Sequence, residues 1–123
     1  NYDNLIEDII TELKYLTEKA LSKGVNQNLI IWDPGIGFAK NTLQNITILK
    51  NLKKFKEEGF PILIGASRKR FIGDVLKIRN PKDRDIGSLA ISCLCSQFNI
   101  EVVRVHNVEY NYQILRMADQ FYR

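Results

Sequence analysis

Apolar and polar positions along the chain follow two different patterns. Four stretches carry apolar residues at helical spacing, and three short, continuous apolar runs lie between them. The first helix is expected from Asp3, a candidate N-cap, to Gly24, and the others over about residues 41–59, 85–98 and 108–122. Helical and strand-like stretches therefore alternate through the whole sequence.

The three apolar runs, at residues 29–32, 61–64 and 102–105, are typical of strands buried in a parallel sheet. Residues 68–84 are charged and broken, which predicts a long loop with a short helix at 71–76. Strands that alternate with helices predict a parallel α/β architecture with right-handed crossovers. Three strands fit either an open doubly wound sheet or part of a (β/α)8 barrel. A whole barrel takes about 250 residues, so this chain could hold only part of one.

Local signals mark the starts of two helices and the inner side of a third. Asn41 with Gln44 three residues later has the pattern of a capping box, and Asn107 is a candidate cap for the last helix. The helix over 85–98 is expected to turn one apolar side inward. That side consists of Ile86, Leu89, Ala90, Cys93 and Leu94.

Composition and charge exclude several classes of protein. The 123 residues are 45% apolar and 26% charged, as in a globular domain, and no apolar run is long enough to span a bilayer. The net charge of +4 is scattered along helices apart from the group at residues 68–70, unlike the basic stripe that nucleic acid requires. Cys93 and Cys95 diverge by roughly 200° on a helix, so reduced thiols are expected, with no shared metal or disulfide.

The first strand is followed by residues suited to a flat, polar ligand, at the end where parallel α/β folds gather their sites. These residues are Asp33, Gly35, Gly37 and Phe38. The carboxylate of Asp33 could accept two parallel hydrogen bonds from an N–C–N edge such as that of a pterin or guanine. The glycines would let the loop lie against the ligand, and Phe38 could cover it. Alternatively, Asp33 only bonds the backbone amides of a turn.

The second and third strands end in basic residues. Three adjacent cations, residues 68–70, repel one another unless a ligand offsets them, although a solvated basic turn would also explain them. Arg104 and His106, the single histidine, alternate on the third strand, so both side chains are expected on the same side. Together they would form a site for phosphate or pyrophosphate, and an edge strand with one wet face is the alternative.

These three segments, in this order and spacing, resemble the dihydropteroate synthase family. The family has an aspartate-proline-glycine-x-glycine-phenylalanine motif, then glycine-x-serine-arginine-lysine, then arginine-valine-histidine, after or on barrel strands six, seven and eight. Here these are residues 33–38, 65–69 and 104–106, and the stretch 84–88 also matches. The resemblance implies the C-terminal half of a (β/α)8 TIM barrel, with three parallel strands and about four main helices. Residues 1–123 would be part of a single barrel domain whose upstream half is absent.

The resemblance implies a role for each matching residue. Asp33 would bind the amino-pyrimidine edge of the pterin, and Lys69 would bond the pterin ring and border the p-aminobenzoate site. Ser67 would hold the p-aminobenzoate carboxylate, with Arg68 and Phe38 beside it. The glycine at position 37 would belong to the same substrate-binding loop.

The pyrophosphate of the pterin substrate would be bound by Arg104 and His106, which with Lys69 form the expected catalytic group. The family condenses 6-hydroxymethyl-7,8-dihydropterin pyrophosphate with p-aminobenzoate in folate biosynthesis, giving 7,8-dihydropteroate and pyrophosphate. The arylamine is already a nucleophile, so the site needs to stabilise the leaving anion and the developing cation rather than supply a strong base.

Cofactor and partners also follow from the resemblance. It implies Mg²⁺, with ligands mainly from the absent half and the substrate pyrophosphate and none within this chain. Sulfonamides would bind as mimics of p-aminobenzoate, the protein would be cytoplasmic, and the C-terminal helices would form a homodimer through residues 110–122. Activity would need the upstream half of the barrel. Two positions depart from the family pattern: Ala39 replaces a usual glycine, and Asn107 replaces a common aspartate.

Two rival functions remain compatible with the sequence. Another pterin-binding barrel, such as a methyltetrahydrofolate methyltransferase, would share the acidic anchor at Asp33. It would not need the basic group at 67–69 or a pyrophosphate site. A non-catalytic structural fragment would need none of these side chains, so substitution of Asp33 by alanine would leave its behaviour unchanged.

Overall fold

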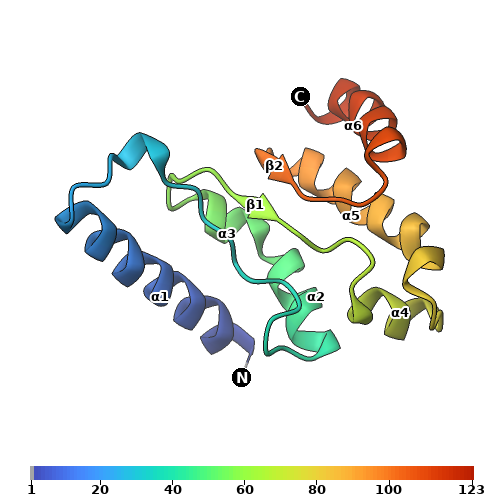
Figure 1. The fold of residues 1–123 in the computed structure, drawn as a ribbon, viewed down its shortest axis with the longest axis horizontal. Helices are drawn as coiled ribbons and strands as arrows, with labels where there is room; N and C mark the ends of the chain where they lie inside the picture. The colour runs from blue at the N-terminus through green and yellow to red at the C-terminus, as the bar shows by residue number, and fades with distance from the viewer. Residues whose placement is uncertain (1) are drawn as a thin grey trace.

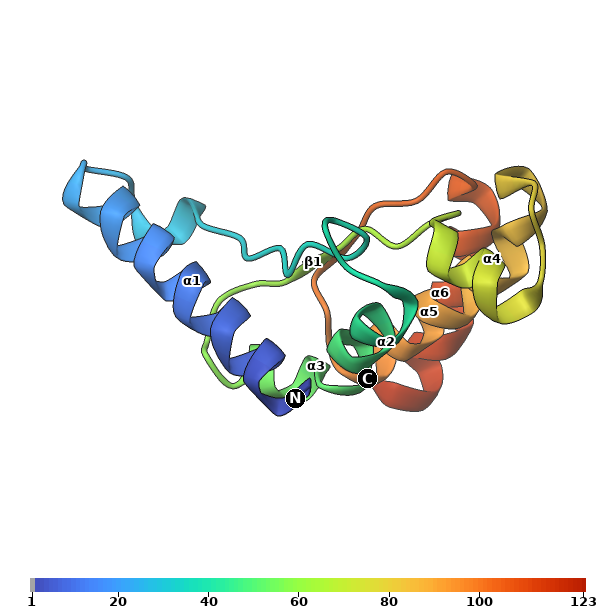
Figure 2. The same ribbon diagram turned by 90° about the horizontal axis from the view of Figure 1, so that it is seen from below.

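The computed structural model describes residues 2–123, with side chains from Asn4 onward. The elements in chain order are α1 (Tyr2–Ser22), η1 (Gln27–Leu29), α2 (Thr42–Lys50), α3 (Leu52–Lys56), β1 (Leu63–Ile64), α4 (Arg70–Leu76), η2 (Pro81–Arg84), α5 (Asp85–Gln97), β2 (Val102–Val103) and α6 (Val108–Tyr122). Figures 1 and 2 show the helices curving around the short central strands, with α1 at one end and α5 and α6 at the other. The side chain of Asp3, expected as a cap, lies outside the described residues.

The strands are parallel, as the sequence predicts. β1 pairs with β2 in the register Leu63 to Val102 and Ile64 to Val103. Trp32 adds an isolated parallel bridge to Ile62. The segment at Trp32, β1 and β2 therefore lie side by side in chain order, and their carboxyl ends share one edge.

The prediction of a continuous buried strand over residues 29–32 was wrong. Leu29 instead ends the 3-10 helix η1 and is 77% exposed, and Ile31 is 52% exposed. The side chain of Asn26 accepts a hydrogen bond from the amide of Asn28, which favours a helical turn over an extended chain. Only Trp32 is paired and buried, so the first expected strand is reduced to one bridge.

The other two strands are shorter than predicted. Residues 61–64 give β1 over Leu63–Ile64 alone, since Pro61 lacks the amide that a ladder needs. Residues 102–105 give β2 over Val102–Val103, although the amide of Arg104 still donates to Ile64 O at 3.0 Å. Arg104 and His106 therefore lie in the loop that follows the strand rather than on it.

The helix predicted over residues 41–59 is divided into α2 and α3. Its start is confirmed, because Asn41 and Gln44 form the expected capping box. Asn51 then interrupts the helix: its side-chain amide donates to Thr47 O at 2.7 Å, and its backbone takes a non-helical conformation. Competition of asparagine side chains with helix backbone bonds accounts for the break.

The prediction of the buried side of α5 was wrong at two of its five residues. Ile86 is 79% exposed and Ala90 is also exposed, whereas Leu94 packs against the core. The fully buried residues of the helix are small: Ser88, Ser92, Cys95 and Ser96. Two of their hydroxyls find partners on α6, because Ser92 donates to Asn111 at 2.6 Å and Ser96 donates to Asp119. Hydropathy therefore missed the small polar residues that this helix buries.

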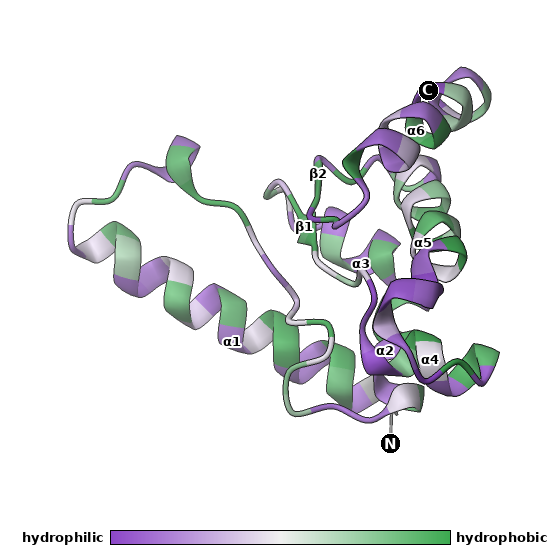
Figure 3. Ribbon diagram, turned by 45° about the vertical axis from the view of Figure 1, so that its right-hand side comes forward, coloured by the Kyte–Doolittle hydropathy of each residue, from purple (hydrophilic) through white to green (hydrophobic). Residues whose placement is uncertain are grey.

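The hydrophobic core lies between the strands and the helices on one side of them. Trp32 is its largest member, and its indole N–H donates to Thr17 at 2.8 Å while its ring stacks on Phe60 at 4.9 Å. Ile48, Leu52, Phe55, Ile62 and Ile64 complete the fully buried centre. Figure 3 shows hydrophobic and hydrophilic residues alternating in bands along α1, and Ile6, Ile9 and Leu13 of this helix belong to or pack against the core.

Cys93 and Cys95 both lie on α5. Both thiols are free, and burial raises the pKa of Cys95 to about 12. Among the described residues, no helix is long and apolar enough to cross a membrane.

Candidate functional site

The loop after Trp32 is held mainly by contacts within itself and with α2. Asp33 is exposed, and its Oδ1 accepts the amide of Gly35 at 2.8 Å. Lys40 Nζ donates to the carbonyls of Gly35 and Phe38, both at 2.9 Å. Asn45 Oδ1, from α2, accepts the amide of Gly37 at 2.8 Å. The loop thus presents the Asp33 carboxylate and the Phe38 ring, which is 63% exposed, to solvent.

Lys69 joins this loop to the one that follows β1. Its ammonium donates to the carbonyl of Ile36 and lies 4.7 Å from the centre of the Phe38 ring. A Cβ at Gly37 would stand 2.7 Å from Lys69 Cδ, so glycine is required for this approach. Burial lowers the pKa of Lys69, the charge of Arg104 lowers it further, and Asp33 opposes them. Lys69 is therefore placed between the charges of Asp33 and Arg104.

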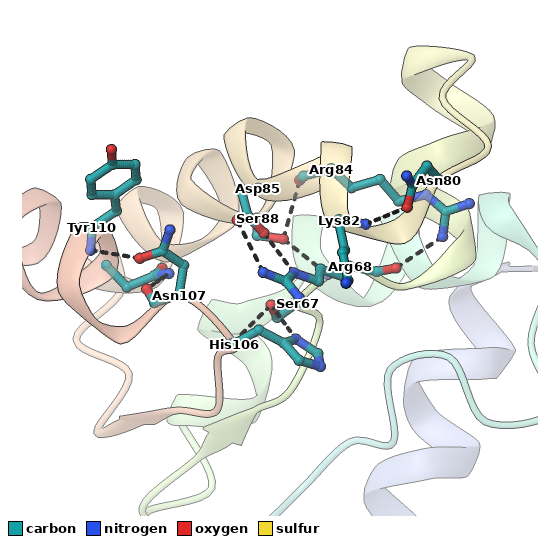
Figure 4. Close-up of polar contacts among 11 residues, drawn as sticks. Ser67, Arg68, Asn80, Lys82, Arg84, Asp85, Ser88, His106, Asn107 and Tyr110 are labelled. Atoms are coloured by element: carbon teal, nitrogen blue, oxygen red, sulfur yellow. Dashed lines mark hydrogen bonds and ion pairs between the residues drawn. The ribbon is translucent and has the colours of Figure 1, made fainter.

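Arg104 and His106 both contact the loop that follows β1. A Cβ at Gly65 would stand 2.7 Å from the Arg104 guanidinium, which shows that this side chain crosses the glycine. His106 Nδ1 lies 2.9 Å from Ser67 Oγ, and the His106 amide donates to the same oxygen at 3.2 Å (Figure 4). The buried hydroxyl of Ser67 is thus engaged by His106.

Arg68 points away from the residues around Lys69. Its guanidinium forms a two-pronged ion pair with Asp85, with distances of 2.8 and 3.2 Å, seen in Figure 4. The hydrogen bond from Arg68 is the largest factor that lowers the pKa of Asp85, and Asn107 and His106 act in the same direction. The same bond raises the pKa of Arg68.

A cavity of about 580 Å³ opens between the two loops. Predicted residues in its wall are Gly37, Phe38 and Lys69. Arg70 and Asn45 also line it, and sequence reasoning assigned neither to the site. The only signal for Arg70 in the sequence is its place as the third cation of a run. The only signal for Asn45 is that it is a polar residue on a mostly apolar helix face. The volume suits a small aromatic molecule.

The predicted residues therefore fall into two groups. One surrounds the cavity, through Phe38 and Lys69, and the other surrounds Ser67, through His106. Asp85 and Arg84, which contact the loop after β1, were also missed, since their partners are 16 or 17 residues away in sequence. Among the described side chains, no three His, Cys, Asp or Glu residues gather as a metal site.

Comparisons with known proteins place this chain in a family. A family model described as pterin binding enzyme matches residues 1–106. Dihydropteroate synthase of Synechocystis sp. is 42% identical over 123 residues, which are 100% of this chain and 43% of that protein. Its counterpart in Bacillus subtilis is 42% identical over 118 residues, 96% of this chain and 40% of the relative.

Solved structures show the same likeness. Clostridium difficile dihydropteroate synthase, solved with pteroic acid, has a TM-score of 0.93 at 42% identity, over 97% of this chain and 45% of that one. The Yersinia pestis enzyme in a sulfonamide drug complex has a TM-score of 0.93 at 30% identity, over 98% and 44%. The expected fold class, the C-terminal half of a (β/α)8 barrel, is confirmed. The chain spans less than half the length of these relatives.

Proposed function

Because this chain belongs to the pterin-binding enzyme family, we propose that it forms the C-terminal part of a dihydropteroate synthase. Residues 1–123 would be one portion of a single barrel domain, completed by an N-terminal portion. The observation that carries the proposal is the meeting of three strand ends. Lys69, after β1, donates to Ile36 O in the loop that begins at Asp33, and Arg104, after β2, passes across Gly65 at the end of β1. That grouping supplies one anionic and two cationic contacts on neighbouring loops.

Asp33 is the proposed anchor of the pterin. Its carboxylate is exposed at the strand end, and the bond from the Gly35 amide to Oδ1 fixes its orientation. An ionised carboxylate accepts two parallel bonds from the N–C–N edge of an amino-pyrimidine, and such charge-assisted pairs are the strong ones. Lys69 would donate to the pterin ring from the opposite side.

The cavity beside Phe38 is the proposed p-aminobenzoate site. Phe38 offers an aromatic face, while Lys69 and Arg70 line the wall and would balance the carboxylate. Ser67, expected to hold that carboxylate, bonds His106, so its proposed contribution comes through that histidine. Sulfonamides, which a Yersinia pestis relative binds, would enter the same cavity.

Arg104 and His106 are the proposed partners of the pyrophosphate. The bond between the pterin methylene carbon and the pyrophosphate oxygen breaks, and its electron pair stays on the leaving oxygen. The lone pair of the arylamine forms the new C–N bond, and the nitrogen then loses a proton. Arg104 and Lys69 would stabilise the departing anion, since fixed cations aimed at developing charge lower the barrier most.

The described residues do not by themselves form a resident magnesium site. Mg²⁺ prefers an octahedral set of oxygen ligands, whereas Lys69, Arg104 and His106 offer nitrogen and positive charge. We therefore assign no step of the reaction to a metal held by this chain. Mg²⁺ would arrive with the pyrophosphate and take its remaining ligands from the N-terminal portion.

Assembly and location complete the proposal. α6 exposes apolar residues, including Val108, Met117 and Phe121, the last at 72%, which would suit contact with a second copy. The two free thiols fit a reducing, cytoplasmic setting.

The test is to complete the barrel with the N-terminal part of the Bacillus subtilis relative and to measure formation of 7,8-dihydropteroate. The fused protein should be active, and Asp33→Ala should lower kcat/KM by roughly a hundredfold, since a charge-assisted pair contributes about 2–3 kcal/mol. Arg104→Ala should abolish binding of the pterin pyrophosphate, which a methyltransferase would not recognise. A folded but inactive fusion that binds neither substrate would refute the proposal.

A further inference from the structure

Arg68 is held at three points by one short segment of the chain. Its amide donates to Ser88 Oγ at 2.9 Å, and its carbonyl accepts from Arg84 Nη1 at 2.9 Å. Its guanidinium grips both oxygens of Asp85. Figure 4 shows these partners gathered around Arg68 where η2 meets α5. All of them lie within residues 84–88, and we call Arg84, Asp85 and Ser88 the clamp.

The clamp holds a backbone conformation that a residue with a Cβ rarely adopts. Arg68 has a φ of 60°, in the left-handed region that favours glycine. Such a conformation persists only where the surroundings impose it. Here hydrogen bonds to the amide, to the carbonyl and to the side chain of Arg68 impose it together.

Arg84 contributes to the clamp as a buried cation bound to main-chain carbonyls. Besides Arg68 O, its guanidinium donates to Ile78 O at 3.0 Å and to Arg79 O at 2.8 Å. A Cβ at Gly73 would stand 2.5 to 2.6 Å from atoms of the Arg84 guanidinium, so this side chain packs against α4 only because residue 73 is glycine. Arg84 therefore ties the end of α4 to the loop after β1.

The turn at Arg68 sends its two neighbours toward different partners. Ser67, before the turn, reaches His106, while Lys69, after it, reaches Ile36 and Phe38. The left-handed conformation of Arg68 lets Ser67 contact His106 while Lys69 contacts Ile36 and Phe38. The clamp thus controls the placement of both.

We infer that Arg84, Asp85 and Ser88 are positioning residues, and that Arg68 is the pivot of the site rather than a cation that binds substrate. This inference rests on the proposed function, since it deepens the account of the same site. It assigns the first of the three basic residues at 68–70 a conformational role that its charge alone does not suggest.

The first test compares Arg68→Gly with Arg68→Ala in the completed barrel. Glycine adopts a φ of 60° freely and alanine does not, so the glycine variant should keep roughly tenfold more of the kcat. Both variants lack the guanidinium, so if Arg68 bound substrate through its charge, both would lose the same share of kcat. Equal kcat values for the two variants would overturn the inference.

The second test uses two buried serines one turn apart on α5. Ser88→Ala removes the acceptor of the Arg68 amide, whereas Ser92→Ala removes a bond to Asn111 that does not touch the loop. Hydrogen exchange at the Arg68 amide should accelerate in the first variant only, and kcat should fall in the first variant only. Equal exchange in both variants would overturn the clamp.

The two proposals fail in distinguishable ways. If the completed barrel makes no dihydropteroate, the proposed function falls, while the exchange rates at Arg68 still decide the clamp. If the barrel is active but the exchange rates do not differ, the clamp alone falls.

Discussion

The loop after Trp32 and the loop after β1 both carry candidate site residues, but they are held in different ways. The first, residues 33–40, is fixed by Lys40 within the loop and by Asn45 just beyond it. The second, residues 65–69, is fixed by side chains 16 to 39 residues farther along the chain. We call them the self-held loop and the clamped loop.

The difference separates two demands on the site. The self-held loop presents exposed groups, the Asp33 carboxylate and the Phe38 ring, and it meets the clamped loop through Lys69, which contacts Ile36 O and the Phe38 ring. The clamped loop places Ser67 and Lys69 through contacts with α5 and with the loop of His106. Its geometry therefore depends on the docking of the last helices as well as on its own sequence.

The largest effect is expected from the substitution Gly73→Ala on α4, which disturbs the clamped loop through Arg84. The new methyl group would meet the Arg84 guanidinium, and we expect the free energy of unfolding to fall by about 1–3 kcal/mol. Helix propensity alone predicts the opposite sign, a gain of up to about 1 kcal/mol. Urea unfolding distinguishes the two outcomes.

The matching change in the self-held loop is Asn45→Ala. It removes the acceptor of the Gly37 amide, a partly buried hydrogen bond, and we expect the free energy of unfolding to fall by about 1 kcal/mol. Hydrogen exchange should accelerate at residues 35–38 and stay unchanged at 65–69. Faster exchange in both loops would show instead that the contact of Lys69 with Ile36 couples them.

A stabilising change is expected at Ala39, where the family usually has glycine. Ala39 has a φ of 51°, so its Cβ is strained in the self-held loop. Replacing it with glycine should raise the free energy of unfolding by about 0.5–1 kcal/mol, the strain relieved less the added freedom of the unfolded chain. Thermal unfolding measures the gain, and a loss of stability would show that the loop does not carry this strain.

The smallest effect concerns pH and the ion pair of the clamped loop, because both partners are partly exposed to water. The pKa of Asp85 is below its ordinary 3.8, so the carboxylate stabilises the fold above that value. This contribution is lost as pH falls through the lowered pKa. The stability difference between Asp85→Asn and the unsubstituted chain should therefore be constant from pH 5 to 7 and shrink below about 3.8. If the stability difference persists in acid, it comes from packing of the Asp85 side chain rather than from its charge.

The sequence predicted elements whose signals are local. The parallel pairing, the capping box at Asn41 and the helix behind Asn107 are all confirmed. The strand at 29–32 and the buried side of α5 were wrong, because in each case polar side chains, asparagine or serine, outweighed the apolar pattern. Such competition depends on the partner that a polar group finds, which hydropathy does not record.

The candidate site was predictable in its residues but not in their contacts. Lys69, Arg104 and His106 were identified from motif and alternation, and the structure brings them to neighbouring loops. The ion pair of Arg68 with Asp85 was not foreseen, since charge alone does not say whether an arginine meets a ligand or a protein carboxylate. Which partner it takes is decided by the docking of α5.

Three cations at or behind the site pass directly across a glycine. The pairs are Lys69 with Gly37, Arg104 with Gly65, and Arg84 with Gly73. A single methyl group at any of these glycines would displace a positive charge while leaving the net charge and nearly the whole composition of the protein unchanged. The positions of these three charges therefore depend on the volume left free at each glycine, so a substitution that adds no charge can still move one.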